Sequence, residues 1–388
     1  MARNLLMIAA AITGALAICG CGYYLLCIWG TYSLLRDYAR RQPKAFMPPV
    51  SLLKPLRGAD REMYAAFRSH CLQNYPDFEI IFGVSEADDP AIALVEQLKQ
   101  EFPGRRINLV FCRERLGANI KVSNLVQMLP HARHEYLLVN DSDIHVEPDY
   151  LRRMMSPFAE TCVGMTTALY RGTAGHTLGS RLEALGISTS FAAGVLSARV
   201  IEGGVHFGLG STLAFTREAL NAMGGFDTLL DYLADDYELG SRISKAGYEV
   251  VLADKVVDTV LPEYRFRDFW EHQLRWMRSV RGSRGWGYFG LVLTFGIPFA
   301  VIAAILARGA AWSLALLGVT LALRYLMAYV TASFAVRDTP ILRHLWLLPL
   351  HDTVALALWA AAYHGNRVVW RGDRFTLKDG KLARLKVG

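Results

Sequence analysis

The chain has 388 residues, enough for one large domain with membrane segments or for two modest domains. Hydrophobic residues make up 53% of it and charged residues 20%, which argues against a uniformly soluble protein and for apolar residues gathered in separate segments. The net charge of +7 raises the alternative of a nucleic-acid-binding protein. Much of the basic excess flanks apolar segments, however, where anionic lipid headgroups explain it better, so we expect membrane lipids and no nucleic acid as partners.

The first apolar segment, Leu5 to Leu35, carries no charged residue and is long enough to cross a bilayer. It exceeds the usual length of a signal-peptide core, and no small-residue cleavage site follows it, so an uncleaved anchor is favoured over a cleaved signal peptide. Basic residues are more frequent after this segment than before it, with Arg3 alone on one side and on the other Arg36, Arg40, Arg41 and Lys44. The positive-inside bias therefore predicts an outside N-terminus and a cytosolic chain after Leu35.

From residue 44 to about residue 284, short apolar runs alternate with helical patterns. Strands are predicted at Val50 to Leu53, Phe78 to Val84, Ile107 to Cys112 and Glu135 to Asn140, with a turn-rich stretch at Pro55 to Asp60. Helices are predicted between them at Tyr64 to Leu72, Ala91 to Phe102 and Val122 to Leu129. This alternation predicts an α/β domain with a mainly parallel, Rossmann-like sheet and helices on both faces. Ligands of such sheets bind beyond the carboxyl ends of the strands.

Carboxylates follow two of these predicted strands. Asp141 and Asp143 come after the fourth strand, separated by one small residue, so both could approach one hard cation that bridges a diphosphate. The alternative is a solvated Asp-rich turn. Asp89 follows the second strand and precedes a proline, where a helix N-cap is its ordinary role. It would nevertheless lie at the same sheet edge, where it could accept hydrogen bonds from a nucleotide base or ribose.

Two further polar sites lie at predicted helix starts. Asp235 and Asp236 open a helix, where they either complement the helix dipole or include the general base that deprotonates an acceptor hydroxyl. Lys121 and Asn124 follow a loop that precedes another helix. They suit a contact with a pyrophosphate or a uracil, although an ordinary surface lysine is the alternative.

The second apolar concentration lies at the C-terminal end and holds three segments. Gly287 to Leu306 and Ala310 to Phe334 are spanning candidates, the latter interrupted only by Arg324. The third, Leu345 to Tyr363, contains a His-Asp pair at 351–352 that would be costly in lipid, so we predict that it is interfacial or re-entrant. A basic tail follows, with Arg367, Arg371, Arg374, Lys378, Lys381, Arg384 and Lys386.

A basic and aromatic cluster, His272-Gln273-Leu274-Arg275-Trp276, precedes the first of these segments by about ten residues. It is either an interfacial anchor or a site that places Arg275 against a departing diphosphate.

The order of these features resembles a known series. A loop Asp, a D-x-D, a helix-start Asp-Asp and an Arg-Trp pair beside the membrane resemble the D, D, D, (Q/R)xxRW series of family 2-like glycosyltransferases with the GT-A fold. More closely, the chain resembles glycosyltransferase family 21, the ceramide glucosyltransferase-like family, over nearly its whole length. The residues that carry this second resemblance are 50–58, 88–92, Lys121, Asn124-Leu125 and Trp370-Arg371-Gly372.

The resemblance implies a nucleotide-sugar site. Asp89, with Lys121 and Asn124, would contact the nucleotide of a UDP-sugar, and Asp141 and Asp143 would hold its diphosphate through Mg²⁺ or Mn²⁺.

It also implies the chemistry. Asp236 would be the base for direct displacement with inversion at the anomeric carbon, and Asp235, Gly210 and Ser211 would lie near the sugar or acceptor. The cluster that closes the site over the diphosphate would comprise His272, Gln273, Arg275 and Trp276.

The sequence departs from the family pattern in three places. His272 stands where Gln or Arg is expected, with Gln273 one place late, and Asp143 completes a D-x-D where animal ceramide enzymes have glycine. The apolar stretch 182–209 is unlike the animal sequences and is expected to shape the lipid site. The compact length, the D-S-D motif and the altered 182–209 stretch favour the bacterial hopanoid-biosynthesis branch, which transfers N-acetylglucosamine from UDP-N-acetylglucosamine to bacteriohopanetetrol. The alternative is a ceramide glucosyltransferase that uses UDP-glucose.

Two other functions are weighed against lipid glycosylation. A polysaccharide synthase needs a channel for its polymer, and three or four short membrane segments are too few for one. A membrane receptor that binds a sugar nucleotide without catalysis has no use for a base such as Asp236.

The expected protein is an integral membrane enzyme whose catalytic domain faces the cytoplasm, in a bacterial inner membrane. Its parts are an N-terminal transmembrane anchor (1–35), a cytosolic GT-A domain with interfacial helices (36–285), C-terminal membrane segments (286–363) and a basic tail (364–388).

Overall fold

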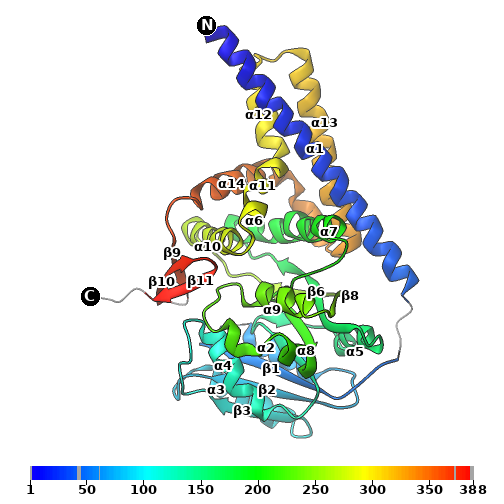
Figure 1. Cartoon of the computed structure of the whole chain (residues 1–388), viewed down its shortest axis with the longest axis vertical. Helices are drawn as coiled ribbons and strands as arrows, with labels where there is room; N and C mark the ends of the chain where they lie inside the picture. Colours follow the sequence, from blue (N-terminus) through cyan, green and yellow to red (C-terminus); the bar gives the residue numbers. More distant parts are fainter. Residues whose placement is uncertain (1, 42–44, 61, 371–372, 385–388) are drawn as a thin grey trace. The chain divides into compact units, whose positions relative to one another are not determined.

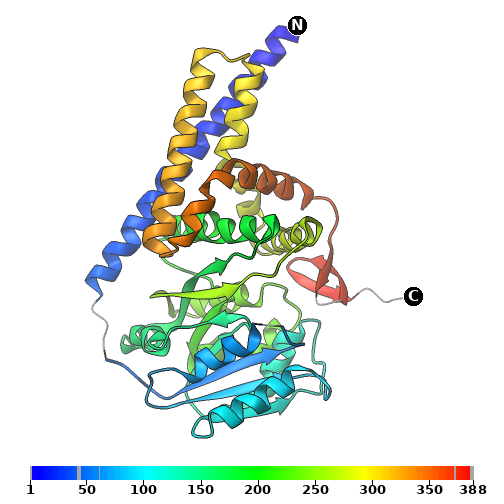
Figure 2. The same ribbon diagram turned by 180° about the vertical axis from the view of Figure 1, so that it is seen from behind.

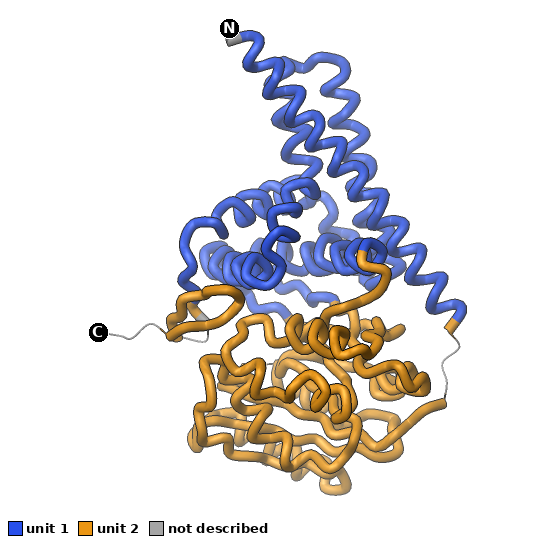
Figure 3. The backbone as a smooth tube through the Cα atoms, in the orientation of Figure 1, with its two compact units in different colours: residues 1–40, 171–201, 261–368 blue, residues 41–170, 202–260, 369–388 orange. Residues whose placement is uncertain are grey.

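The computed structural model describes residues 2–41, 45–60, 62–370 and 373–384. Lys44, Arg371, Gly372 and Lys386, which the sequence analysis invokes, lie outside the described residues. The chain divides into two compact units, coloured separately in Figure 3. Unit 1 comprises residues 1–40, 171–201 and 261–368, and unit 2 comprises residues 41–170, 202–260 and 369–388.

Unit 2 is built on an eight-stranded sheet with the strand order β3-β2-β1-β4-β7-β6-β8-β5. Its strands are β1 (Val50–Leu56), β2 (Phe78–Val84), β3 (Arg106–Phe111), β4 (Tyr136–Asn140), β5 (Ile144–His145), β6 (Val163–Thr173), β7 (Thr212–Thr216) and β8 (Glu249–Val260). The pairs β1–β2, β2–β3 and β1–β4 are parallel. The pairs β4–β7, β6–β7 and β5–β8 are antiparallel. The predicted α/β class is confirmed, and antiparallel strands extend the parallel part of the sheet.

Helices of unit 2 connect these strands. They are α2 (Met63–Cys71), α3 (Ala91–Glu101), α4 (Ile120–Met128), α5 (Tyr150–Met155), α8 (Arg217–Ala222) and α9 (Asp235–Lys245), with 3₁₀ turns η1 (Leu129–His131), η2 (Ser156–Ala159) and η4 (Phe226–Leu229). Every residue of β1 and β2 is buried, as their nearly continuous apolar sequences require of parallel strands covered on both faces. The carboxyl ends of β1, β2 and β4 meet at one edge, where the loops described below begin.

The first strand is longer than its sequence predicts. β1 continues through Pro55 to Leu56, so the turn expected at Pro55 to Asp60 begins later. The pairing of β1 with β4 covers only 50–53, and beyond Leu53 the described partner of β1 is β2. On the side of β4, the strand therefore makes no ladder hydrogen bonds at Pro55 among the described residues. This suits a proline, which has no amide hydrogen to donate.

Unit 1 is mainly helical. Its long helices are α1 (Ala2–Arg40), α6 (Leu178–Gly186), α7 (Ala192–Ile201), α10 (Phe266–Arg284), α12 (Gly296–Leu306), α13 (Ala311–Val330) and α14 (Leu348–Ala361). Shorter turns are η3 (Ile187–Phe191), α11 (Trp286–Gly290), η5 (Leu291–Thr294), η6 (Thr331–Ala335) and η7 (Pro340–Leu347). Strands β9 (Arg367–Trp370), β10 (Asp373–Lys378) and β11 (Lys381–Arg384) form a second sheet, of which β10 and β11 belong to unit 2.

Three helices of the described residues are long and apolar enough to cross a membrane: 3–40, 178–201 and 311–335. The first and third agree with the predicted spans, whereas the second was expected only as an apolar stretch. The segment predicted as a span at Gly287 to Leu306 is not one straight helix, because α11 with η5 and α12 form a pair bent by 56°. That it crosses the membrane stays a prediction. The break falls at Phe295, just before α12, whose first turn holds Pro298, a residue that cannot continue a preceding helix.

Helices α1, α12 and α13 lie side by side within unit 1 (Figures 1 and 2). Their backbones approach closely where α1 meets α12, since a Cβ on Gly20 would lie 2.5 Å from the Cα of Gly296. Small residues permit this kind of contact between membrane helices.

A buried ion pair joins α13 to α14 within unit 1. Arg324 donates from Nε to Asp352 Oδ2 at 2.8 Å and from Nη2 to Oδ1 at 2.9 Å, and His351 Nδ1 lies 3.0 Å from the same Oδ1. Arg324 and Asp352, each a charged residue in an apolar segment, are therefore partners of one another. α14 itself has 14 residues, shorter than the roughly 20 that a spanning helix needs.

Candidate active site

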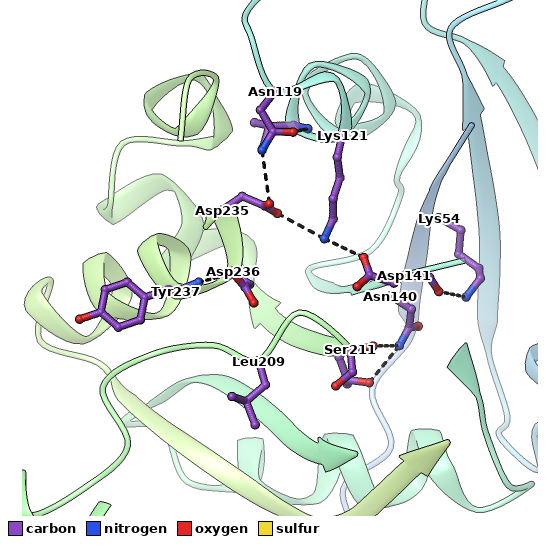
Figure 4. A network of polar contacts seen from close by, with 12 residues as sticks. Lys54, Asn119, Lys121, Asn140, Asp141, Leu209, Ser211, Asp235, Asp236 and Tyr237 are labelled. Atoms are coloured by element: carbon purple, nitrogen blue, oxygen red, sulfur yellow. Dashed lines mark hydrogen bonds and ion pairs between the residues drawn. The ribbon is translucent and has the colours of Figure 1, made fainter. Parts of the chain in front are cut away.

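Charged side chains from three segments of unit 2 meet at the carboxyl edge of the parallel strands (Figure 4). Lys121 Nζ lies 2.8 Å from Asp141 Oδ1 and 3.3 Å from Asp235 Oδ2. Asn119 Nδ2 donates to Asp235 Oδ1 at 3.3 Å. The structure thus brings together a lysine from the start of α4, a carboxylate that follows β4 and a carboxylate from the start of α9.

Local sequence explains why Lys121 points into this network. Asn119 is the N-cap of α4, because its Oδ1 accepts the amide hydrogen of Val122 at 3.1 Å. The same side chain donates from Nδ2 to the carbonyl of Tyr232 at 2.8 Å. Asn119 therefore fixes the start of α4 and, through Asp235, the start of α9. Asn119 was not among the predicted site residues, although an Asn just before a helical pattern is a recognisable cap signal.

Asp236 lies beside the glycine that was expected near the sugar. A Cβ on Gly210 would lie 2.8 Å from Asp236 Oδ2 and 3.6 Å from Asp141 Oδ2. The other oxygen, Asp236 Oδ1, accepts the amide hydrogen of Tyr237 at 2.8 Å. The absence of a side chain at residue 210 therefore lets the carboxylate of Asp236 approach the backbone closely, with Asp141 near the same point.

The electrostatics of these carboxylates differ from those of exposed acids. Burial raises the pKa of Asp236, and the negative charge of Asp235 raises it further, while the Lys121 ammonium acts in the opposite direction. Burial disfavours the ammonium form of Lys121, but the charges of Asp141, Asp235 and Asp236 outweigh it and raise its pKa. A carboxyl with a raised pKa beside a fixed cation is suited to proton transfer near neutral pH.

Asp141 and Asp143 form the second part of the site. Asp143 Oδ2 accepts from Thr259 Oγ1 at 2.5 Å, and burial followed by the negative charge of Asp141 raises the pKa of Asp143. Their mutual repulsion is what a divalent cation would relieve. Within the described part of the chain, no group of three or more His, Cys, Asp or Glu side chains could hold a metal alone. A cation held by this pair would need its other oxygen ligands from elsewhere, such as a bound diphosphate.

A buried polar network that the sequence analysis missed lies beneath the acidic pair. Lys54 is fully buried in β1, with Nζ 3.3 Å from the carbonyl oxygen of Asp141 and 3.4 Å from His70 Nε2. His70 Nε2 lies 3.2 Å from Asn140 Oδ1. Burial lowers the pKa of Lys54 to about 7, although Asp143 and Asp141 oppose the shift. Within the apolar sequence of β1, nothing indicates that the ammonium of Lys54 contacts the loop that follows β4.

Asn140 ties this network to β7. Its Nδ2 donates to Tyr150 Oη at 2.9 Å, to the Ser211 carbonyl at 3.0 Å and to Thr212 Oγ1 at 3.0 Å. The predicted residue Ser211 thus contributes its carbonyl, while its hydroxyl donates to the Ala168 carbonyl at 3.5 Å. The backbone next to Gly210 is therefore held by the last residue of β4.

Asp89 and Asn124 have local partners of their own. Asp89 is buried and accepts from the amide of Gly58 at 2.9 Å and from that of Ala91 at 2.9 Å. Asn124 is buried in α4, where its Oδ1 accepts from Ser85 Oγ at 2.9 Å. Asp89 joins the loop after β1 to the loop after β2, and Asn124 joins the latter loop to α4. The contact of either residue with a nucleotide stays a prediction.

The remaining predicted site residues lie in unit 1, on α10. His272 Nδ1 lies 3.2 Å from Oε1 of Glu183, and its ring stacks on Tyr264 with centroids 5.5 Å apart. The Trp276 ring contacts His272 and Phe191, with centroids 5.5 and 6.4 Å apart. Gln273 and Arg275 occupy the same helix. That these four residues close the site over a diphosphate stays a prediction.

Glu183 is a further residue that the sequence analysis missed. It is buried in α6, and its Oε2 has no hydrogen-bond partner among the described residues. A carboxylate in an apolar stretch that could span a membrane is itself a signal of function, which could have identified it.

Known structures place this fold in a class. The mannosyltransferase PcManGT from Pyrobaculum calidifontis, solved in complex with GDP-Man and Mn²⁺, matches 92% of this chain and 99% of its own with a TM-score of 0.54 at 19% identity. This likeness shows a GT-A glycosyltransferase fold, as the resemblance implied.

The chain belongs to glycosyl transferase family 21, whose family model matches residues 12–383. Ceramide glucosyltransferase 1 of Caenorhabditis elegans is 28% identical over 225 residues, which cover 57% of this chain and 47% of that protein. Ceramide glucosyltransferase 3 of the same organism is 25% identical over 275 residues, covering 69% and 59%. The chain therefore spans about half the length of the curated relatives it matches.

Proposed function

We propose that this chain transfers a sugar from a UDP-sugar to the hydroxyl of a membrane lipid, with inversion at the anomeric carbon. The observation that carries the proposal is the position of Asp236, a carboxylate with a raised pKa that lies beside Gly210 and near Asp141 at the carboxyl edge of the sheet. Membership of family 21, the GT-A fold and the helices that could span a membrane support the same conclusion.

The residues divide the reaction between them. As the acceptor oxygen attacks the anomeric carbon, its proton passes to Asp236 and the bond from that carbon to the UDP oxygen breaks. Lys121 holds Asp141 and Asp235 in place and presents a positive charge at the same edge. A divalent cation bound by Asp141 and Asp143 would neutralise negative charge on the departing diphosphate.

The proposal also concerns which UDP-sugar is the donor and which lipid is the acceptor. The curated relatives above are named ceramide glucosyltransferases, which favours UDP-glucose and a sphingolipid base. Transfer of N-acetylglucosamine to bacteriohopanetetrol, favoured by the sequence departures, stays a prediction. Both alternatives require a primary or secondary hydroxyl of a lipid. The proposal places it at the cytosolic face, because Arg36 and Arg40 lie at the C-terminal end of α1 and Arg41 follows it.

A transfer assay tests the function. The full-length protein in lipid nanodiscs is given radiolabelled UDP-glucose or UDP-N-acetylglucosamine with Mn²⁺, and ceramide or bacteriohopanetetrol as acceptor. We expect label in the organic phase for one donor and acceptor pair. Label found only as free sugar or as a water-soluble polymer, with every pair, would contradict the proposal.

The same preparation separates an enzyme from a binding protein. In the enzyme, Asp236→Asn abolishes transfer and leaves UDP binding intact, because the amide cannot accept the proton. A receptor that binds UDP-sugars without turnover would give no product with either form of the protein.

A further inference from the structure

The C-terminal hairpin of unit 2, formed by β10 and β11, pairs with the chain just before the catalytic aspartates. The amide of Leu382 donates to the carbonyl of Asp231 at 2.7 Å, and the amide of Leu233 donates to the carbonyl of Gly380 at 3.1 Å. Between these bonds, Tyr232 and Lys381 form an antiparallel bridge. The hairpin therefore adds a strand edge to the segment 231–233, which we call the pre-helix segment because α9 begins at Asp235.

The pre-helix segment in turn holds the loop that carries Asn119. The amide of Ala118 donates to Asp231 Oδ1 at 3.0 Å, and the side chain of Asn119 donates to the carbonyl of Tyr232 at 2.8 Å. Asn119 also donates to Asp235 Oδ1. A continuous series of hydrogen bonds thus runs from the hairpin through the pre-helix segment and Asn119 to Asp235, which contacts Lys121.

Aromatic packing supports the same contact. The ring of Tyr232 contacts two cations, with Lys381 Nζ 5.2 Å and the Arg242 guanidinium carbon 4.7 Å from the ring centroid. Lys381 comes from the hairpin and Arg242 from α9, so the ring joins the hairpin to the catalytic helix itself.

Ion pairs hold the N-terminal end of the hairpin, at Asp373. The carboxylate of Asp373, at the start of β10, lies 3.6 Å from Arg57, 3.5 Å from Arg115 and 3.6 Å from Arg384. Arg57 follows β1 and Arg115 follows β3, so both come from loops at the carboxyl edge of the sheet. Isolated surface pairs contribute little, but here one carboxylate separates three guanidinium groups that would otherwise repel one another.

We propose that the hairpin of residues 373–384 is a positioning element of the sugar-transfer site. By pairing with the pre-helix segment it fixes Asn119, and Asn119 fixes the places of Asp235 and Lys121. The inference rests on the proposed function, since it assigns a role to the C-terminal residues in the same site. A detached hairpin leaves the fold of the sheet intact and misplaces the charges that receive the donor, so it raises the KM for the UDP-sugar and lowers kcat.

Two matched substitutions in the full-length protein test this role. Asp373→Asn removes the carboxylate that three arginines share. Asp379→Asn makes the same chemical change at the exposed turn of the hairpin, where the backbone has φ +51, a conformation that Asn adopts readily. Asp373→Glu, which keeps the charge, serves as the rescue.

Amide hydrogen exchange is read by mass spectrometry in peptides that cover 373–384, 230–236 and 117–121, with the peptide of β2 as the control for the fold. For Asp373→Asn we expect exchange to be about tenfold faster in all three peptides and unchanged in β2. We also expect kcat/KM for the donor to fall by about tenfold. Asp379→Asn and Asp373→Glu should both resemble the wild type.

Faster exchange in the hairpin alone, with 117–121 and kcat/KM unchanged, would overturn the proposal. If Asp373→Asn leaves the hairpin docked, Leu382→Pro decides in the same way, because proline cannot donate the hydrogen bond to Asp231. The exchange measurement needs no turnover. A wild-type protein without transfer activity would therefore reject the proposed function, while the exchange rates would still judge whether the hairpin holds the loop.

Discussion

Asp236 and Asp235 differ in their surroundings although they are adjacent. Asp235 contacts Lys121 and Asn119, whereas Asp236 accepts from the amide of Tyr237 on one oxygen and has the backbone of Gly210 beside the other. Neighbouring carboxylates with different partners are a usual way to assign a base and a positioning group. We therefore propose Asp236 as the group that receives the proton and Asp235 as the group that places Lys121.

The pH dependence of transfer should report this division. A base acts in its ionised form, so kcat/KM rises with pH through the pKa of Asp236 and then becomes constant. Because burial and then the charge of Asp235 raise that pKa, Asp235→Asn should move the acid limb of the profile to lower pH. The profile is measured as initial rates at low donor concentration. An acid limb that stays in place would mean that another group is the base.

Asp143 gives a separate prediction about the metal. With Mn²⁺ present, Asp143→Ala should weaken UDP-sugar binding by about tenfold or more, because one of two carboxylate ligands is lost. Calorimetric titration with and without EDTA measures this. Chelation should weaken the wild type strongly and the variant little. Equal affinity of the wild type for the UDP-sugar with and without the cation would contradict the metal-binding role of Asp143.

At the scale of elements, the contact between α1 and α12 depends on glycine. Gly20→Leu should destabilise unit 1 by about 1–3 kcal/mol, since even a Cβ there would overlap Gly296. Gly22→Leu is the matched control, because nothing lies within 4 Å of a Cβ at that position. Thermal unfolding in detergent compares the two. Equal losses in both variants would show that helix propensity, and not the close contact, matters.

The ion pair between α13 and α14 gives a second prediction at this scale. Arg324→Leu leaves the buried carboxylate of Asp352 without its main partner and should cost about 3–5 kcal/mol. The double substitution Arg324→Leu with Asp352→Leu removes both charges and should recover most of that loss. A double variant that is less stable than Arg324→Leu alone, in the same thermal unfolding assay, would contradict the role of the pair.

For the whole molecule, the sequence was a good guide to the parallel half of the sheet. The strand predicted at Phe78 to Val84 has those bounds, because an apolar run between turn residues leaves few alternatives. The antiparallel strands β6, β7 and β8 were not predicted, since their pairing depends on long-range contacts. The break at Phe295 was also missed, because composition alone describes 287–306 as one apolar run.

The site was predictable in part for the same reason. Strand-end carboxylates such as Asp141 stand out in the sequence, because the sheet class fixes the edge at which they emerge. Lys54 and Asn119 did not stand out, since their roles come from neighbours far along the chain. The docking of residues 373–384 on the pre-helix segment has no sequence signal at all, because a basic tail is equally typical of a membrane flank.

Lipid glycosylation with Asp236 as its base can be tested by the lipid content of cells that express the protein. Lipids are extracted from cells with the wild type, with Asp236→Asn and with an empty vector, and are compared by mass spectrometry. We expect a lipid heavier by one hexose or one N-acetylhexosamine with the wild type, and about 10²–10⁴-fold less of it with Asp236→Asn at equal protein level. An unchanged lipid profile in cells that contain the acceptor, or equal product from Asp236→Asn, would contradict lipid glycosylation with Asp236 as its base.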